Sequence, residues 1–197
     1  MNPAYVGRLA PEKRLGFLEQ AWSRIRSRAP DTALVLVGDG PARADLEERA
    51  PPGVHLTGFL KGEALARAFA SADVFVFPSD TETFGNVVAE AMASGVAVVG
   101  VHAGGVIDIV RDGETGLVVQ PNDLDAFVEP VLRLLSDAAL RTRLGRQARS
   151  EAQGLSWERV LDGLFEDYED ALGEARCATP SRFEGPRISK APRAPAD

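Results

Sequence analysis

Short apolar runs alternate along this chain with longer amphipathic segments. The runs are continuous rather than alternating, which is typical of strands buried on both faces. They span Ala4–Gly7, Ala33–Gly38, Val54–Thr57, Asp73–Phe77, Val96–Val101 and Gly116–Val119. The segments between them have helical periodicity and span Glu12–Arg28, Ala42–Arg49, Gly62–Ala72, Asn86–Ser94 and Gly105–Val110. This alternation predicts an α/β fold with a doubly wound parallel sheet of about six strands.

Further helical patterns follow the last apolar run, at Leu124–Leu135, Ala138–Ala152 and Trp157–Leu172. The last one carries an apolar stripe that packs on this domain or covers something outside it. The stripe consists of Trp157, Leu161, Leu164, Phe165, Tyr168 and Leu172. Residues 173–197 mix proline with Ala, Ser, Arg and Lys without apolar periodicity, which predicts a disordered tail. We therefore expect one domain over residues 1–172.

Composition narrows the classes of protein that fit. The net charge of −7 argues against non-specific nucleic-acid binding, which needs a basic surface. Cys177 is the single cysteine, so no intrachain disulfide is possible. No apolar run approaches the roughly 18 residues of a membrane helix, and the N-terminus does not resemble a signal peptide. We expect a cytoplasmic protein and leave a peripheral membrane contact open.

The predicted fold indicates where a ligand binds. In the commonest doubly wound order, 3-2-1-4-5-6, the order reverses between strands 1 and 4, and ligands bind outside the carboxyl ends of those strands. The loop after strand 1 contains Gly7, Arg8 and Lys13. Two cations at this edge can clamp a phosphate, whereas the alternative interpretation is ordinary surface charge.

The loop after strand 4 leads into a helix at about Asn86. Gly85 permits close backbone approach, and the N–H groups of Phe84, Gly85, Asn86 and Val87 form an anion site at a helix N-terminus. Two carboxylates accompany this loop. Glu82 precedes the helix and Glu90 lies opposite its apolar face, so both are candidates for ligand contact or for plain solvated charge.

Other motifs are weaker. The stretch from Gly38 to Pro41 lacks the third glycine of a dinucleotide fingerprint and follows the wrong strand, so NAD is not expected. Gly104 and Gly105 either offer further N–H donors or form a plain turn. His55 and His102 lie far apart without Cys or carboxylate clusters, so neither is expected to bind zinc.

Taken in order, these segments resemble one family. They are Tyr5–Leu9, Glu12-Lys13, Val37–Pro41, Phe77–Ser79, Glu82–Gly95, Gly104-Gly105 and Asp112–Val119. Together they resemble the C-terminal domain of a group 1 glycosyltransferase, the retaining family 4 with a two-Rossmann (GT-B) architecture. The stretch Thr81–Val88 is most similar to bacterial mannosyltransferases and sulfoquinovosyl-lipid synthases.

The resemblance implies a role for each matching residue. It places Gly7, Arg8 and Lys13 at the donor diphosphate, Glu82 near the donor sugar hydroxyls and Glu90 on the nucleotide ribose. It places Leu60 and Lys61 near the base, and the backbone of Phe84, Gly85, Asn86 and Val87 on phosphate and sugar. It implies Glu82, Arg8 and Lys13 as the catalytic set, with a GDP- or UDP-sugar donor and neither metal nor cofactor. Asp108 stands where many relatives have Glu.

In that family an N-terminal domain binds the acceptor, and this sequence shows none of it. We therefore expect a chain that binds the donor without transferring sugar alone, and that self-associates through the Trp157–Leu172 stripe. The alternatives are a non-catalytic nucleotide-sugar-binding or interaction module, and another two-domain sugar enzyme. A phosphorylase would need a pyridoxal-phosphate lysine in a recognisable context, and an epimerase fits the Glu82–Glu90 stretch poorly.

Overall fold

The computed structural model describes residues 1–49, 51–154, 161–169 and 172, which fall into two compact units, Met1–Leu155 and Ser156–Asp197. The second unit contains a helix over residues 161–169. Its apolar side chains are exposed at Leu161, Leu164, Phe165 and Tyr168. Trp157 and the predicted tail over 173–197 lie outside the described residues. The expected domain boundary at residue 172 stays a prediction.

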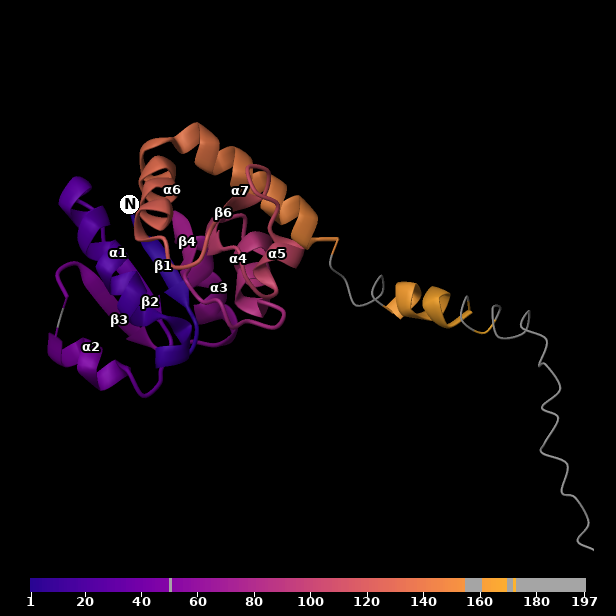
Figure 1. The fold of residues 1–197 in the computed structure, drawn as a ribbon, viewed down its shortest axis with the longest axis horizontal. Coiled ribbons are helices and arrows are strands. Elements are labelled where there is room, and N and C mark those ends of the chain that lie inside the picture. Colours follow the sequence, from indigo (N-terminus) through magenta and orange to yellow (C-terminus); the bar gives the residue numbers. More distant parts are fainter. Residues whose placement is uncertain (50, 155–160, 170–171, 173–197) are drawn as a thin grey trace, which may run out of the picture. The chain divides into compact units, whose positions relative to one another are not determined.

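The first unit is built on a six-stranded sheet in which every neighbouring pair is parallel (Figure 1). The strands are β1 (Pro3–Val6), β2 (Leu34–Val37), β3 (Val54–Gly58), β4 (Val74–Phe77), β5 (Ala97–Val101) and β6 (Gly116–Val119). Their order is β3-β2-β1-β4-β5-β6, so the predicted fold class and strand order are confirmed. Ala4 of β1 pairs with Val35 on one side and Phe75 on the other, which places β1 at the reversal of strand order.

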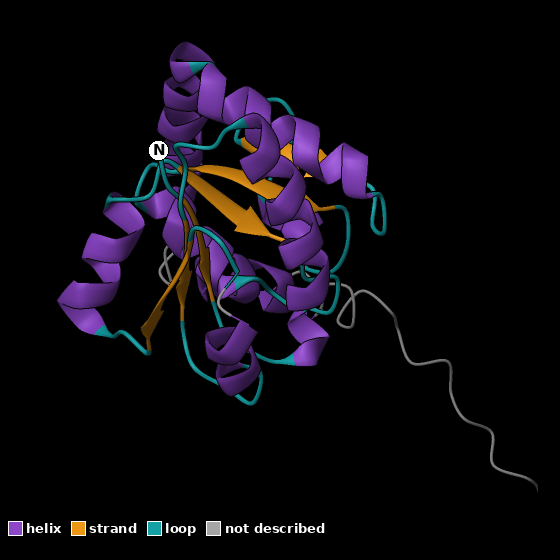
Figure 2. Cartoon of the chain, turned by 90° about the vertical axis from the view of Figure 1, so that its left-hand side faces the viewer, coloured by secondary structure: helices purple, strands orange, loops and turns teal. Residues whose placement is uncertain are grey.

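Helices lie on both faces of this sheet (Figure 2). They are α1 (Leu15–Arg28), α2 (Arg43–Arg49), α3 (Gly62–Ala70), α4 (Asn86–Ala93), α5 (Val106–Ile109), α6 (Leu124–Ser136) and α7 (Ala138–Ala152), with a short 3₁₀ helix η1 (Pro11–Lys13). α1 packs against α6, and α7 packs against α4. In the described part of the chain, no helix combines the length and apolarity needed to cross a bilayer.

The core follows from the apolar runs. Every residue of β4 and of β5 is buried, as continuous runs in central parallel strands should be. The edge strand β3 instead alternates between partly buried and exposed residues over most of its length. Aromatic rings stack within the core, with centroids 6.4 Å apart for Tyr5 and Phe77 and 6.0 Å apart for Phe75 and Phe77.

One predicted helix is interrupted. The pattern over Glu12–Arg28 predicts a continuous helix, but the chain forms η1 and then α1, with Arg14 between them in a left-handed conformation at φ 57°. The continuous helix was therefore wrong at this point. Amphipathic periodicity reports which face is buried, and it does not register a single residue that reverses its φ.

Helix α7 approaches the sheet closely through two glycines. A Cβ added at Gly145 would lie 2.2 Å from the carbonyl oxygen of Gly95, well inside van der Waals contact. Gly16, in the first turn of α1, has no neighbouring atom within 4 Å of the same added carbon. The two helical glycines therefore differ sharply in how closely other atoms pack on them.

This difference gives a stability prediction. Gly16→Ala should stabilise the fold by up to about 1 kcal/mol, because alanine is the better helix former in open space. Gly145→Ala should instead destabilise it by about 1–3 kcal/mol, because the methyl group meets backbone that cannot yield. Urea unfolding of the two variants beside the original chain measures both effects, and a stabilising Gly145→Ala would contradict the close approach.

Candidate functional site

A hollow of about 420 Å³ opens at the carboxyl edge of the sheet, where β1, β2 and β3 end and α4 begins. We call it the carboxyl-edge hollow. It is lined by Val6, Gly7, Arg8, Val37, Gly38, Asp39, Phe59, Leu60, Leu65, Val87 and Glu90. Its volume falls within the roughly 300–1,000 Å³ of small-molecule sites. Five of the residues singled out in the sequence therefore share one hollow: Gly7, Arg8, Leu60, Val87 and Glu90.

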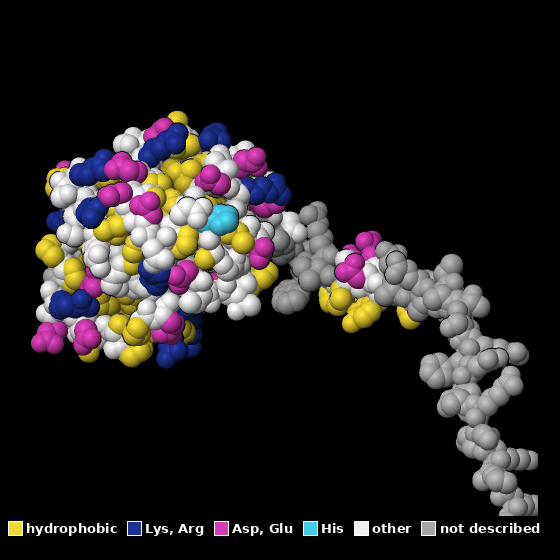
Figure 3. Space-filling view, viewed as in Figure 1, with side chains coloured by type: hydrophobic (Ala, Val, Ile, Leu, Met, Phe, Trp, Pro, Cys, Tyr) yellow, Lys and Arg dark blue, Asp and Glu magenta, His cyan; other side chains and the backbone are white. Residues whose placement is uncertain are grey.

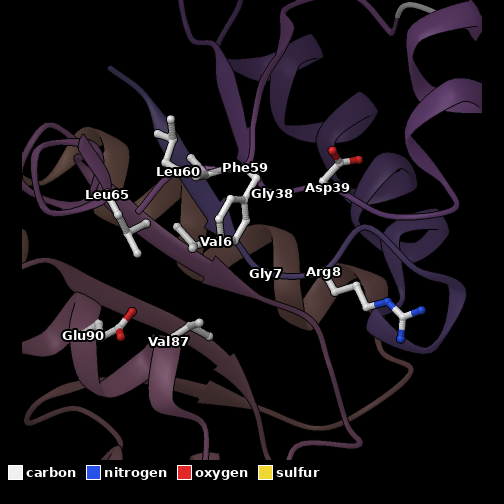
Figure 4. A pocket seen from close by; sticks show the side chains of 11 residues that line it. Val6, Gly7, Arg8, Gly38, Asp39, Phe59, Leu60, Leu65, Val87 and Glu90 are labelled. Atoms are coloured by element: carbon white, nitrogen blue, oxygen red, sulfur yellow. The ribbon is translucent and has the colours of Figure 1, made fainter. Parts of the chain in front are cut away.

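The lining has an apolar middle and charged ends (Figure 4). Val6, Phe59 and Leu60 lie together in the close-up, with Glu90 on α4 and Arg8 toward opposite sides of the view. Phe59 is 71% exposed, which is unusual for a phenylalanine and leaves a ring face open to a ligand. An arrangement with an apolar middle and few polar groups is typical of sites that hold a small organic molecule.

The loop after β1 is supported from below by Tyr5. Its ring is fully buried, and its hydroxyl donates to the carbonyl oxygen of Arg8 at 3.1 Å. Burial raises the pKa of the Tyr5 phenol above its ordinary value, with smaller contributions from Glu82 and Glu12. The hydroxyl therefore stays a donor. The Arg8 side chain is exposed and lies 3.5 Å from Glu12, a pair that adds little stability and leaves Arg8 available.

The loop after β4 turns into α4 at Gly85, whose φ of 80° favours glycine. The carbonyl of Gly85 accepts from the N–H groups of Val88 and Ala89. Within the described residues, no acceptor bonds the N–H groups at positions 84–87. Phe84, Gly85, Asn86 and Val87 thus present unpaired donors at the positive end of a helix, as the sequence predicts.

The pair of glycines after β5 anchors this loop. Gly105 donates its N–H to the carbonyl oxygen of Glu82 at 2.9 Å. A Cβ at Gly104 would lie 2.1 Å from that same oxygen. Of the two interpretations left open, the described contacts give Gly105 a structural bond to the loop rather than a free donor.

An ion pair joins the two loops across the reversal of strand order. Lys13 donates to a carboxylate oxygen of Glu82, and both side chains are about four-fifths buried. The two residues therefore lie together, as the sequence analysis expects of site residues, but their opposite charges already neutralise each other. A lysine ammonium has three N–H donors, so a ligand oxygen can bind Lys13 without breaking this pair.

Glu90 lies on α4 and faces the carboxyl-edge hollow (Figure 4). Partial burial removes some of the water around the carboxyl of Glu90 and raises its pKa above the ordinary value. Val88, Ala91 and Met92 form the buried face of the helix, whereas Val87 is half-buried and lines the hollow. Lys61 is exposed at the N-cap of α3 and does not line the hollow.

The sequence analysis missed a clamp beside this site. The guanidinium of Arg14 bonds Asp80 in the loop after β4 and Asn122 after β6, and it lies 5.4 Å from the ring centroid of Phe17. Three loops of the carboxyl edge are therefore tied through one side chain. The only signal in the sequence was a third cation directly after Lys13.

Two further lining residues were also undervalued. Gly38 and Asp39 were set aside as a turn, yet they line the hollow. A Cβ at Gly38 would lie 1.9 Å from the carbonyl oxygen of Gly7, so this glycine permits the two loops to meet.

Among the described residues, no three His, Cys, Asp or Glu side chains gather in a way that suits a metal ion.

The sequence of this chain matches the family described as "Glycosyl transferases group 1" over residues 3–137. The chain belongs to the group 1 glycosyl transferases. The resemblance predicted from the motifs is confirmed.

Within the group 1 family, the chain is similar to two sets of relatives expected from the sequence. It is 40% identical over 174 residues to the sulfoquinovosyl transferase SQD2 of Arabidopsis thaliana, a match that covers 85% of this chain and 33% of that protein. It is 42% identical over 170 residues to a GDP-mannose-dependent alpha-mannosyltransferase of Mycolicibacterium smegmatis, covering 86% and 43%. The chain thus spans less than half the length of these relatives.

Solved structures agree on the fold. The C-terminal domain of LpcC, a group 1 protein from Francisella tularensis, is 22% identical with a TM-score of 0.69, covering 78% of this chain and 85% of that one. The Anabaena protein HepE, solved with UDP and glucose, is 22% identical with a TM-score of 0.74, covering 86% and 48%. The Rossmann-like unit is therefore one half of the GT-B architecture.

The left-handed backbone at Arg14 leads to a paired prediction. Arg14→Gly and Arg14→Ala both remove the bonds to Asp80 and Asn122, but only alanine keeps a Cβ in the strained conformation. Arg14→Ala should therefore be less stable than Arg14→Gly by about 1 kcal/mol.

Chemical denaturation of both variants measures this difference. Arg24→Ala is the control, since Arg24 pairs with Asp125 on an exposed surface and lies within a right-handed helix. It should change stability by less than about 0.5 kcal/mol. Equal stability of the glycine and alanine variants would show that position 14 carries no backbone strain.

Proposed function

We propose that this domain binds the nucleoside diphosphate sugar donor of a retaining, metal-independent hexosyl transfer to an acceptor. The observation that carries the proposal is the joint placement of Arg8, Glu90 and the unpaired N–H groups of positions 84–87 around one edge of the sheet. Two relatives support it by name: the mycobacterial enzyme is GDP-mannose-dependent, and HepE was solved with UDP.

The diphosphate is assigned to the meeting point of the two loops. Its charge suits the helix N-terminus at Asn86 and the guanidinium of Arg8, with Lys13 as a point charge behind them. These groups also favour the leaving diphosphate as the sugar bond breaks, because fixed donors stabilise charge that develops in the transition state. Arg8 and Lys13 thereby act in catalysis as well as in binding.

The remaining parts of the donor follow from this placement. A carboxylate accepts two hydroxyl hydrogen bonds, so Glu90 is assigned to the ribose. Phe59 and Leu60 give the base an apolar surface, and Lys61 lies next in the chain. Glu82 is assigned to the hydroxyls of the donor sugar, where its ion pair with Lys13 fixes its orientation.

A second function, a module that binds the nucleotide sugar without transferring it, shares all of these contacts. Titration calorimetry with GDP, UDP and their mannose and glucose conjugates tests the part common to both. Failure of every nucleotide to bind would remove both functions. A labelled-donor assay, run with this chain alone and with a supplied group 1 N-terminal domain, separates them. We expect transfer only on supplementation, because positioning both reactants accounts for roughly 7–11 kcal/mol of barrier lowering.

The diphosphate role of Arg8 is tested by Arg8→Ala. Loss of the guanidinium should weaken nucleoside diphosphate binding by about 1.5–3 kcal/mol, the range for hydrogen bonds to charged groups. Arg67→Ala is a matched control, because Arg67 is also exposed and also pairs with a glutamate four residues away. Calorimetry should show the control unchanged, whereas an unchanged Arg8→Ala would remove the assignment.

The ribose role of Glu90 is tested by Glu90→Gln at several pH values. The variant should bind nucleosides as well as nucleoside diphosphates more weakly, because the ionised carboxylate is the better acceptor. The raised pKa of Glu90 means that its charge is lost at a higher pH than for an exposed glutamate. The advantage of the original chain should therefore be largest above that raised pKa and should narrow as the pH falls through it.

The same shift makes a separate statement about stability. Folding favours the protonated form of Glu90, so this carboxyl stabilises the fold fully at a pH below its pKa in the unfolded chain. The contribution is lost as the pH rises through its higher pKa in the folded chain. Glu63→Gln on the exposed surface of α3 is the control for both measurements. If Glu90→Gln weakened the binding of nucleotide sugars only, and left nucleosides and nucleoside diphosphates unchanged, the assignment of Glu90 to the ribose would be contradicted.

A further inference from the structure

A second hollow lies at the opposite, amino edge of the sheet. It has a volume of about 310 Å³ and shares no lining residue with the carboxyl-edge hollow. We call it the amino-edge hollow. Its walls are the turns that lead into β4 and β5 together with one side of α7. It is lined by Ala72, Asp73, Ser94, Gly95, Val96, Ala97, Arg141, Thr142, Arg146 and Arg149.

Three arginines of α7 line this hollow. Arg141, Arg146 and Arg149 lie along the flank of the helix beside its buried residues. The close contact of Gly145 with Gly95 holds this flank against the turn before β5. The chain as a whole carries −7, so a site with three positive side chains and one negative side chain stands out against it.

These arginines differ from most others in their partners. Elsewhere in the described unit, cations form ion pairs at Arg8, Lys13, Arg14, Arg24, Arg28, Arg43, Arg49, Arg67 and Arg111. Charges of both signs accordingly intermingle on the face in Figure 3. Within the residues that the structure describes, no carboxylate lies within 4 Å of a guanidinium nitrogen of Arg141, Arg146 or Arg149. The acid of the lining, Asp73, accepts instead from the N–H of Asn2 at 2.7 Å.

Capping of a helix does not account for the three cations. α4 ends at this hollow, but its last carbonyls already accept backbone N–H groups from Ser94, Gly95 and Val96. Only Arg141 donates to a helix carbonyl, that of Leu134 at 2.7 Å, and this uses one of its five N–H donors. Within the described residues, the three guanidinium groups therefore keep most of their N–H donors for an added acceptor.

We propose that the amino-edge hollow binds the phosphate group of a phosphate ester. Guanidinium forks match phosphate oxygens in pairs, and three of them around a small polar hollow suit a dianionic or diester group better than a carboxylate. The hydroxyl of Thr142 adds a further donor. The ester is either a soluble metabolite or a phospholipid headgroup, which present the same chemistry to the arginines.

The test compares two double variants with equal loss of charge. Arg146→Gln/Arg149→Gln removes two cations of the hollow. Arg133→Gln/Arg143→Gln removes two cations that also lack ion pairs in the described residues but do not line it. Glutamine preserves helix propensity in both. The soluble probe is glycerol 3-phosphate, and the lipid probe is phosphatidylcholine vesicles with and without phosphatidylglycerol.

Each arginine near an anionic surface contributes about fivefold to binding, so the hollow variant should bind roughly 25-fold more weakly. The control variant should bind whichever probe the original chain binds with an affinity within about twofold of the original, because its two lost cations do not line the hollow. Loss confined to glycerol 3-phosphate identifies a soluble ligand, and loss confined to anionic vesicles identifies a headgroup. Equal binding by both variants, or no binding of either probe by the original chain, would overturn the proposal.

A single variant guards against a change in folding. Arg146 and Arg149 are both exposed, but the side chain of Arg149 lies near Gly95. Arg146→Gln alone therefore removes one charge and leaves this neighbour of Gly95 in place. The ligand that binds should raise the thermal midpoint of the original chain and raise that of Arg146→Gln less. An equal rise in both would place the phosphate elsewhere.

Discussion

The pairing of β1 with both β2 and β4 is the constraint on which the rest of this structure depends. Because all three strands run parallel, their carboxyl ends meet at one edge, and the loops after β1 and β4 leave it in opposite directions. Hydrogen bonds continue beyond the strands: Gly7 donates to Val37, and Gly38 donates to Gly58. The backbone under the carboxyl-edge hollow is therefore an extension of the sheet.

The other side of that hollow is held by different means. Strand pairing does not continue into the loop of residues 78–85. The loop is held instead by the N–H of Gly105, by the ion pair of Glu82 with Lys13 and by the bond of Asp80 with Arg14. One side of the hollow is thus fixed by pairing that continues the sheet, and the other by separate bonds from neighbouring loops. The unpaired N–H groups of positions 84–87 lie on the second of these sides.

Sequence patterns predicted the strands, their order and the start of α4, because each depends on burial periodicity or on a local turn. The periodicity was blind to Arg14, whose partners Asp80 and Asn122 are 66 and 108 residues away. It was equally blind to Gly38, which matters because the carbonyl of Gly7 passes beside it. Contacts between distant loops have no local signature, so the frame of the site was predictable and its clamps were not.

The two edges of a parallel sheet also differ in how they can hold an anion. At the carboxyl edge α4 begins, so backbone N–H groups supply positive potential and the nearby cations can remain in ion pairs. At the amino edge α3 and α4 end, and helix C-termini repel anions. An anion site there must draw its positive charge from side chains that are not already neutralised. Arg141, Arg146 and Arg149 meet that requirement within the described residues, which explains why the proposed phosphate site is built from guanidinium groups whereas the proposed donor site draws on backbone N–H groups.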